Sequence, residues 1–594
     1  MISAIKSIVQ WNPTVPQKPG ITERVHRALI ILMMLGLVFS MVFPIIELLK
    51  RALQDQSGTY IGLDNFTTYF TSPSLFQSAY HTVTIAIITT IISVSAAFLF
   101  AYAIERTHMK GKTFFTYIGL LPLFAPTMMY GIALIYLLGN NGLLTTGFFG
   151  LTEQWFGWEE FDFELYGMKG IIISEVIFTF PQAFLILKVA LSTADQRLYE
   201  AADTLGASTL RKLVTVTLPS IKYGLVSAFF VCFTLSFTDF GAPKVVGGQY
   251  NVLATDVYKQ VIGQQNFSMG ATVGIILTIP AIIAFIVDQT IQRKQSGGVN
   301  SRAVPYKTPK NKGRDRLYLL YCSAIAFSVL LLFGAIAAAA FVKVWPYDFS
   351  LTLRNFGFGS VAGDGLKPYW NSLIVSTLTA TIGTAVIFIG AYLTEKSRHL
   401  KWVRKVSYFL SILPIALPGL VIGLAFIFFF NEQAFTIPFI NMEIANPFKW
   451  LYGSLAILVL ANIVHFYAVA FITANTSLKK QDDEFESVSE AMNVPFYKTF
   501  SRVTVPLSLP AILEMAMYLF VNSMTTISAV VFLYSPDWKL ASIAIVNMDD
   551  AGDIAPAAAM SLLIIATNII VRVVYELLSK KLMNRTNAWK QTQT

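Results

Sequence analysis

Twelve long apolar segments constrain the fold of this chain more than any other feature of its sequence. A helix needs roughly 20 apolar residues to cross about 30 Å of hydrocarbon. The segments lie at residues 28–50, 79–104, 114–138, 168–190, 222–243, 269–290, 317–342, 370–394, 404–430, 451–474, 508–533 and 556–579. With 55% hydrophobic and 13% charged residues, the 594-residue chain is also too apolar for a soluble globular protein. We therefore expect an all-α protein that crosses a membrane about twelve times.

The charges between the apolar segments predict how the chain is oriented. If the N-terminus is cytoplasmic, most of the 44 Lys and Arg residues fall in cytoplasmic stretches, as the positive-inside rule requires. The outer stretch 139–167 then contains acidic residues and no basic ones. The first apolar segment follows basic residues and has no small-residue cleavage pattern, so we read it as an anchor. Both termini are expected in the cytoplasm.

Several function classes are disfavoured by the residues present. The net charge of +10 comes from short clusters between apolar segments, which does not suggest a nucleic-acid partner. Cys232 and Cys322 lie inside apolar runs, so neither a disulfide framework nor a cysteine metal site is indicated. The stretch "KGKT" at 110–113 resembles the end of a phosphate-binding loop, but Arg106 replaces the required first glycine. We expect no metal, no cofactor and no catalytic site.

A linker divides the sequence into two halves. Residues 291–316 combine Gly, Pro and Ser with many basic residues, which is typical of a cytoplasmic connection. The first half is then 1–290 and the second half 317–594, each with six predicted spans. Because six is even, both halves would enter the membrane in the same direction, as in transporters built from parallel repeats.

The two halves also repeat each other in sequence. The stretches that begin at Ala101 and Ala391 share Ala-Tyr-x-x-Glu, a basic turn and Leu-Pro-x-x-x-Pro. The paired residues are Glu105 with Glu395, Pro122 with Pro414, and Pro126 with Pro418. Proline removes a backbone donor, so we expect a kink in the third and ninth spans.

A second repeated motif lies in the loop between the fourth and fifth spans of each half. "EAADTLGASTLRKLVTVTLP" at 200–219 aligns with "SVSEAMNVPFYKTFSRVTVP" at 487–506, an offset of 287 residues. Gly206 aligns with Asn493, and these two residue types adopt left-handed dihedral angles most readily. Acidic residues upstream, at Asp195 and Asp482, suit the start of a helix. Each copy is predicted to be a short helix, a turn and a second helix ended by a proline.

The pattern Glu-Ala-Ala-x-x-x-Gly, nine residues and x-x-Leu-Pro resembles the coupling-loop signature of ABC importer permeases. The resemblance implies a fused, duplicated permease of the bacterial inner membrane, with coupling loops at 195–219 and 482–506. It also implies two ATPase subunits docked inside, which hydrolyse the ATP, and a substrate-binding protein outside. The implied coupling residues are Glu200, Ala201, Ala202, Gly206, Pro219, Glu486, Ser487, Asn493 and Pro506. The second copy has Ser-Val-Ser in place of Glu-Ala-Ala, so its docking is expected to be weaker or differently tuned.

Other interpretations of the same features remain open. The motif alone fits an interfacial amphipathic helix on a basic cytoplasmic face, which would not explain its second copy. Twelve spans in parallel halves also occur in secondary transporters, but the spans contain few paired charges for ion coupling. A passive channel or an assembly scaffold is the third alternative, and the sequence shows no ring of identical polar residues.

Polar residues inside the predicted spans are candidates for a translocation pathway, because an unpaired charge in the membrane is costly. Glu175 aligns with Asn462 at the same offset of 287, which places polar groups at equivalent sites of both halves. The remaining candidates are Asp239, Lys244 and Glu514. The alternative for each is a hydrogen bond between helices that only fixes their packing.

The outer stretch 239–267 resembles the corresponding loop of permeases in the iron(III) and 2-aminoethylphosphonate branch, and the phosphonate members more closely. This resemblance implies 2-aminoethylphosphonate or a similar phosphonate as substrate, with iron(III) as the alternative. Lys244, Gln249 and Asn251 would offer hydrogen-bond donors to an anion at the outer mouth. An ordinary solvated loop is the competing interpretation.

Overall fold

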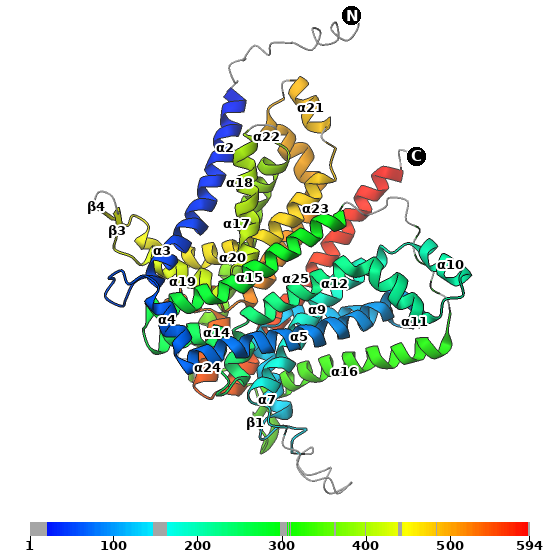
Figure 1. The fold of residues 1–594 in the computed structure, drawn as a ribbon, viewed down its shortest axis with the longest axis horizontal. Helices are drawn as coiled ribbons and strands as arrows, with labels where there is room; N and C mark the ends of the chain where they lie inside the picture. Colours follow the sequence, from blue (N-terminus) through cyan, green and yellow to red (C-terminus); the bar gives the residue numbers. More distant parts are fainter. Residues whose placement is uncertain are drawn as a thin grey trace, which may run out of the picture.

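A computed structural model describes residues 21–146, 163–296, 304, 306, 308, 310–360, 364–397, 400–437, 442–482, 484–492 and 494–591 (Figure 1). Within these ranges, ten helices are long and apolar enough to cross a membrane. Two further pairs of helices meet the same test but are bent sharply, so the total is twelve if each pair is one span. The expected all-α fold with about twelve spans is confirmed.

The long helices of both halves follow a similar order, while the short elements between them differ. The first half contains α2 (Ile21–Leu37), η1 (Val38–Val42), α3 (Phe43–Ala52), α4 (Asp64–Thr71), α5 (Pro73–Arg106), α6 (Lys112–Leu120), η2 (Leu121–Phe124), α7 (Thr127–Leu138), α9 (Met168–Ser192), α10 (Gln196–Thr204), α11 (Thr209–Lys212), η3 (Leu213–Thr217), α12 (Leu218–Thr238), α13 (Gly241–Val246), α14 (Leu253–Tyr258), η4 (Lys259–Gly263) and α15 (Phe267–Ser296).

The second half contains α16 (Lys312–Phe341), β1 (Val342–Val344), β2 (Asp348–Leu351), η5 (Arg354–Phe356), η6 (Phe358–Ser360), α17 (Lys367–Glu395), α18 (Lys401–Ile412), η7 (Leu413–Ala416), α19 (Gly419–Phe430), β3 (Ala434–Ile437), β4 (Met442–Ala445), η8 (Lys449–Leu451), α20 (Leu455–Lys479), α21 (Glu484–Ala491), α22 (Phe496–Thr499), η9 (Phe500–Thr504), α23 (Val505–Thr525), α24 (Ala541–Asp550) and α25 (Ile554–Gln591). The strands form two antiparallel hairpins, β1 with β2 and β3 with β4. The last long helix of each half begins at Phe267 and Ile554, so the offset of 554 − 267 = 287 residues also holds in the structure.

The third and ninth spans are broken rather than kinked, which corrects the expectation from the prolines. The two parts meet at 105° in the first half and at 114° in the second. Ala125 and Leu417, which precede Pro126 and Pro418, have extended backbones. A proline disfavours the helical conformation of the residue before it and donates no hydrogen bond, so the helix ends and restarts.

Pro219 and Pro506 do not end the second helix of each loop, which is a further correction. In the first half, α11 continues through the π-helical turn η3 into α12 as one helix over Thr209–Thr238. Pro219 is the second residue of α12, and Pro506 has the same place in α23. The wider π-helical turn before each proline replaces the regular hydrogen bonds that its ring would prevent. Each loop is therefore joined rigidly to the span that follows it.

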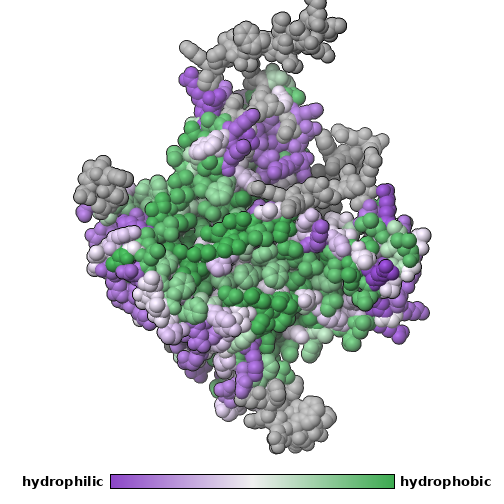
Figure 2. Space-filling model, in the orientation of Figure 1, coloured by the Kyte–Doolittle hydropathy of each residue, from purple (hydrophilic) through white to green (hydrophobic). Residues whose placement is uncertain are grey.

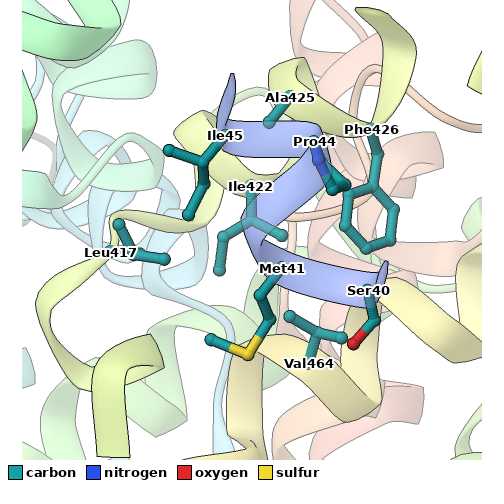
Figure 3. Close-up of a pocket in the computed structure, with 9 residues that line it drawn as sticks. All are labelled: Ser40, Met41, Pro44, Ile45, Leu417, Ile422, Ala425, Phe426 and Val464. Atoms are coloured by element: carbon teal, nitrogen blue, oxygen red, sulfur yellow. The ribbon is translucent and has the colours of Figure 1, made fainter. Parts of the chain in front are cut away.

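The first long helix of each sequence half packs against the other half. The helix formed by α2, η1 and α3 contacts α17, α18 and α19, while α16 contacts α5, α6 and α7. Figure 3 shows this crossing at the bend of the second half, where Met41 and Pro44 face Leu417 and Ile422 around a narrow crevice. The crevice has a volume of only about 10 Å³ and an apolar lining, so it fits no polar substrate. The two sequence halves are thus packed together through their first long helices.

The two ends of the helix bundle differ in the elements that they carry. In Figure 1, α10 and α21 lie along the upper right of the molecule, and α4, α14 and α24 lie at its lower left. Figure 2 shows a broad hydrophobic band between purple, hydrophilic surfaces at these two ends. The candidate coupling loops and the candidate outer mouth are therefore on opposite sides of the apolar band.

Candidate functional site

The first candidate coupling loop is a capped helix followed by a left-handed turn. The Asp195 side chain accepts a hydrogen bond from the backbone N–H of Arg197 at 3.1 Å, as expected at a helix start. Gly206 has a φ of +69°, and its N–H donates to the Asp203 carbonyl at 2.9 Å. The Ala207 N–H donates to the Ala202 carbonyl at 3.0 Å and closes the helix. The predicted sharp bend at Gly206 is present.

The second loop repeats these hydrogen bonds at the same offset of 287 residues. The Glu484 N–H donates to the Asp482 side chain at 3.0 Å, like Arg197 to Asp195. The Val494 N–H donates to the Ser489 carbonyl at 2.8 Å, like Ala207 to Ala202. Asn493 itself lies outside the described residues. The backbone that surrounds it nevertheless closes the helix as in the first loop.

The predicted coupling residues divide into exposed and buried ones. Glu200, Ala201 and Gly206 are exposed, and the Glu200 side chain accepts a hydrogen bond from Gln196. Ala202 is buried, so its small side chain serves the packing of α10 on the protein. In the second loop, Glu486 and Ser487 are half-buried.

Both loops expose apolar side chains at equivalent positions, which the motif did not reveal. Leu198, Leu205 and Leu210 are exposed in the first loop. Adding 287 to these numbers gives the exposed residues of the second loop, Phe485, Met492 and Tyr497. Leu205 is 85% exposed and Met492 is 71% exposed. We name each set of three the apolar face of its loop, and exposed apolar patches of this kind mark interaction surfaces.

A basic residue anchors each loop to the rest of its half, and sequence reasoning also missed this pair. Arg106 is buried, and its guanidinium donates to the Leu191 carbonyl at 2.7 Å at the end of α9. In the second half, the Lys396 ammonium donates to the Gln481 carbonyl at 2.7 Å and lies 4.0 Å from Glu486. The sequence did contain a signal for this pair, because a basic residue directly follows Ala-Tyr-x-x-Glu in both repeats.

Residues of the linker contact the first loop directly. The Gln196 N–H donates to the Val304 carbonyl at 3.0 Å, and the Val304 N–H donates to Asp195 at 3.3 Å. The Arg106 guanidinium lies over the Tyr306 ring, 4.0 Å from its centre, and over the Tyr199 ring at 5.2 Å. These contacts hold α10 against the end of α5, so the loop presents its apolar face from a fixed position.

The candidate pathway residues are not all gathered in one place, although Glu175 and Asp239 are near enough to interact electrostatically. Glu175 is buried in the first half and accepts hydrogen bonds from Ser236 and, at 3.4 Å, from Thr89. Its counterpart Asn462 is fully buried, and neither its amide nitrogen nor its amide oxygen has a hydrogen-bond partner. Asp239 accepts from the Ala242 N–H at 2.9 Å, within the first turn of α13. Glu514 is exposed on α23.

Lys244 joins the two halves at the end opposite the coupling loops. Its ammonium lies 2.6 Å from Asp550 of α24, which belongs to the second half. The neighbouring rings of Tyr258 and Phe532 stack across the same boundary with centres 6.4 Å apart. Burial and then repulsion by Asp550 raise the pKa of the next carboxyl, Asp549, to about 7. Side chains of the two halves therefore meet directly at this end of the molecule.

No group of three or more His, Cys, Asp or Glu residues among those described could hold a metal ion. Cys232 and Cys322 are both buried free thiols. The described residues thus form a helical membrane protein with two matched loops at one end and a contact between the two halves at the other.

Comparison with known proteins identifies both halves. Residues 94–297 and 386–584 each match the family described as "Binding-protein-dependent transport system inner membrane component". The ferric transport system permease protein FbpB of Actinobacillus pleuropneumoniae is 27% identical over 504 residues, which cover 83% of this chain and 69% of that protein. The putative 2-aminoethylphosphonate transport system permease protein PhnU of Salmonella typhi is 26% identical over 253 residues, 42% of this chain and 84% of that protein.

A solved bacterial ABC transporter involved in the import of the acidic polysaccharide alginate is 17% identical, with a TM-score of 0.39 over 46% of this chain and 96% of that one. The two family matches cover more than half of the chain and leave out the first long helix of each sequence half, which packs on the opposite half. The chain thus belongs to the family of binding-protein-dependent transport system inner membrane components, and it is a fused, duplicated ABC importer permease of the inner membrane.

Proposed function

We propose that this permease receives its substrate from an external binding protein and that two separate ATPase subunits dock on its coupling loops, 195–219 and 482–506. The observation that supports this proposal is that the two loops have the same local structure. They share the same helix caps, the same closing hydrogen bonds and the same exposed apolar positions at one offset. A symmetric pair of ATPases requires two such surfaces. Hydrolysis of ATP then belongs to those subunits.

The proposed orientation places both loops and both termini in the cytoplasm and the closed mouth outside. The two native cysteines are buried, so a single new cysteine can be labelled with little background. We expect Gln249→Cys to react with an impermeant maleimide in intact cells, and Thr209→Cys to react only after the membrane is opened. Both positions are exposed, and Gln249 comes shortly before α14 while Thr209 begins α11, two helices at opposite ends in Figure 1. The reverse labelling pattern would contradict the orientation.

For the substrate, we propose iron(III) first. The relatives that support this choice match both halves of the chain, and they are named ferric transport permeases. The Fe(3+)-transport system permease protein FbpB 2 of Haemophilus influenzae is a further example, 23% identical over 86% of this chain and 91% of that protein. The phosphonate relative PhnU has a comparable identity of 26%, but its alignment covers only 42% of this chain.

A phosphonate, such as 2-aminoethylphosphonate, is the second candidate because of one structural observation. Lys244, Asn251 and Lys259 line the same pocket at the outer mouth, so this mouth offers positive charge and hydrogen-bond donors. An anionic phosphonate needs such donors to replace its hydration shell. A bare trivalent cation would be repelled by the two lysines.

Growth of a deletion strain separates the two substrates. We expect the deletion to slow growth in iron-limited medium and to leave growth on 2-aminoethylphosphonate as sole phosphorus source unchanged. Complementation with the intact gene is the control. A defect on 2-aminoethylphosphonate alone would transfer the assignment to the phosphonate. No stimulation of ATP hydrolysis by any loaded binding protein in the reconstituted complex would contradict the importer function itself.

A further inference from the structure

A small polar pocket lies at the closed outer mouth, and it is formed entirely by the first half. It has a volume of about 110 Å³ and is lined by Pro243, Lys244, Gly248, Tyr250, Asn251, Thr255, Tyr258 and Lys259. A water molecule occupies about 30 Å³ in the liquid, so the pocket has room for a few waters or one small tetrahedral oxyanion. No carboxylate belongs to its lining.

The wall of the pocket is held in place by the second span. The ring of His81 stacks on Tyr250 with centres 3.7 Å apart, and its Nδ1 lies 3.0 Å from the Asn251 carbonyl oxygen. The Lys259 ammonium donates to the side-chain oxygen of Asn251. Among the described residues, Lys259 has no carboxylate partner within ion-pair distance. The charge of Lys259 does act on Asp256. Burial raises the pKa of Asp256 to about 6, and the charge of Lys259 opposes this effect.

The second lysine of the pocket forms an ion pair with a carboxylate of the other half. Lys244 is paired with Asp550 at 2.6 Å, and its ammonium also lies 5.2 Å from the centre of the Tyr258 ring. An anion that enters the pocket would compete with Asp550 for this ammonium. Since the ion pair joins the two halves, such competition would weaken the contact that closes the mouth.

The corresponding positions of the second half show that packing does not require these charges. At the offset of 287 residues, Lys244 corresponds to Val531 and Lys259 corresponds to Val546, both buried and apolar. The helices that contain Lys259 and Val546 are equivalent, since α24 begins and ends near the counterparts of α14 and η4, whereas Lys244 is in α13 and Val531 is in a turn. The second half thus has two valines at the positions where the first half has two lysines. Packing alone does not explain the lysines.

We propose that this pocket is an oxyanion-binding site, in which Lys244 and Lys259 bind the anion and Asp550 is its built-in competitor. The proposal rests on the importer function proposed above and defines the chemistry at its outer mouth. Binding of the anion would release Asp550 and so favour opening of the mouth. The oxyanion has two possible sources. It is either the phosphonate group of an organophosphonate or an oxyanion that accompanies iron(III), because this cation hydrolyses at neutral pH unless oxygen ligands hold it.

Methylphosphonate is a suitable probe for the site, with binding measured by ³¹P NMR line broadening on the full-length permease in phosphatidylcholine nanodiscs. We expect Lys259→Gln to weaken binding at least about tenfold, because a charge-assisted hydrogen bond is lost. Asp550→Asn should strengthen binding severalfold, because the competitor is neutralised. Lys367→Gln is the matched control. Its exposed pair with Asp537 lies outside the pocket, and binding should not change.

The gain of affinity in Asp550→Asn separates this proposal from a merely structural role of the lysines, which predicts no gain. Uptake by cells with the Lys259→Gln variant then distinguishes the sources. Loss of 2-aminoethylphosphonate uptake alone identifies the organophosphonate, and loss of iron(III) uptake alone identifies the anion of the iron complex. Methylphosphonate binding that is equal in intact protein, Lys259→Gln and Lys367→Gln would overturn the site. Because the binding assay contains no ATPase, that outcome would leave the importer function untouched.

Discussion

Substitution of Gly206 by proline should abolish transport while the protein still inserts and folds in the membrane. Gly206 has a φ of +69°, whereas proline requires a φ near −65°. Proline also removes the N–H that donates to the Asp203 carbonyl. The turn between α10 and α11 cannot form, so Leu205 and Leu210 lose their relative placement on the apolar face. The measurement is recovery of the ATPase subunits with the tagged permease, together with substrate uptake.

Two variants control for this result. Gly206→Asn should retain docking, because asparagine tolerates left-handed dihedral angles and Asn493 is the residue at the equivalent place of the second loop. Gly62→Pro creates the same local conflict at a φ of +65°, but in the loop before α4 at the other end of the molecule, and should leave ATPase recovery intact. Full ATPase recovery with Gly206→Pro would show that this turn does not position a docking surface.

The features predicted well from the sequence are local ones. A helix-starting acid, a left-handed turn and a run of apolar residues depend mainly on neighbours in the chain, so Asp195 and Gly206 have the expected geometry. The repeat offset of 287 could also be read directly, because both halves retain it from the coupling loops to the last span.

The features missed depend on contacts between distant segments. The proline pairs indicated where backbone donors are lost, but the bends of 105° and 114° depend on the helices packed around them. Nothing in the order of the spans revealed that α2 and α16 pack on the opposite halves. Sequence alone also treated Pro219 as a helix end, because it did not reveal the π-helical turn that accommodates this residue.

The apolar faces were missed for a different reason. Leucines at positions 198, 205 and 210 look like buried residues of an amphipathic helix, and only the structure shows that they point away from the protein. A comparison of the two halves could have revealed them. The second loop has lost the Glu-Ala-Ala sequence, but it has large apolar residues, Phe485, Met492 and Tyr497, at the positions of the three leucines. An apolar side chain that recurs in an otherwise polar loop serves a partner more readily than its own fold.

Leu205→Asp should therefore weaken docking of the ATPase about tenfold to a hundredfold. Burial of a leucine side chain contributes roughly 1.5–3 kcal/mol, and each 1.4 kcal/mol is a factor of about ten in affinity. The aspartate would in addition be placed uncompensated in an apolar contact. Leu63→Asp is the matched control, because Leu63 is 65% exposed just before α4, at the end of the molecule away from the coupling loops, and should leave docking unchanged. Affinity is measured by titration of purified ATPase onto the permease in nanodiscs.

The equivalent variant of the second loop tests whether both loops dock with equal strength. Met492 is 71% exposed at the place of Leu205, but Ser487, Val488 and Ser489 replace Glu-Ala-Ala beside it. If these replacements weaken docking of the second loop, less affinity remains to be lost, so Met492→Asp should cost less than Leu205→Asp. A bulky residue at Ser489 should likewise cost less than one at the buried Ala202. Equal losses at the two loops would show instead that the shared apolar face, and not the Glu-Ala-Ala sequence, determines how tightly the ATPase binds.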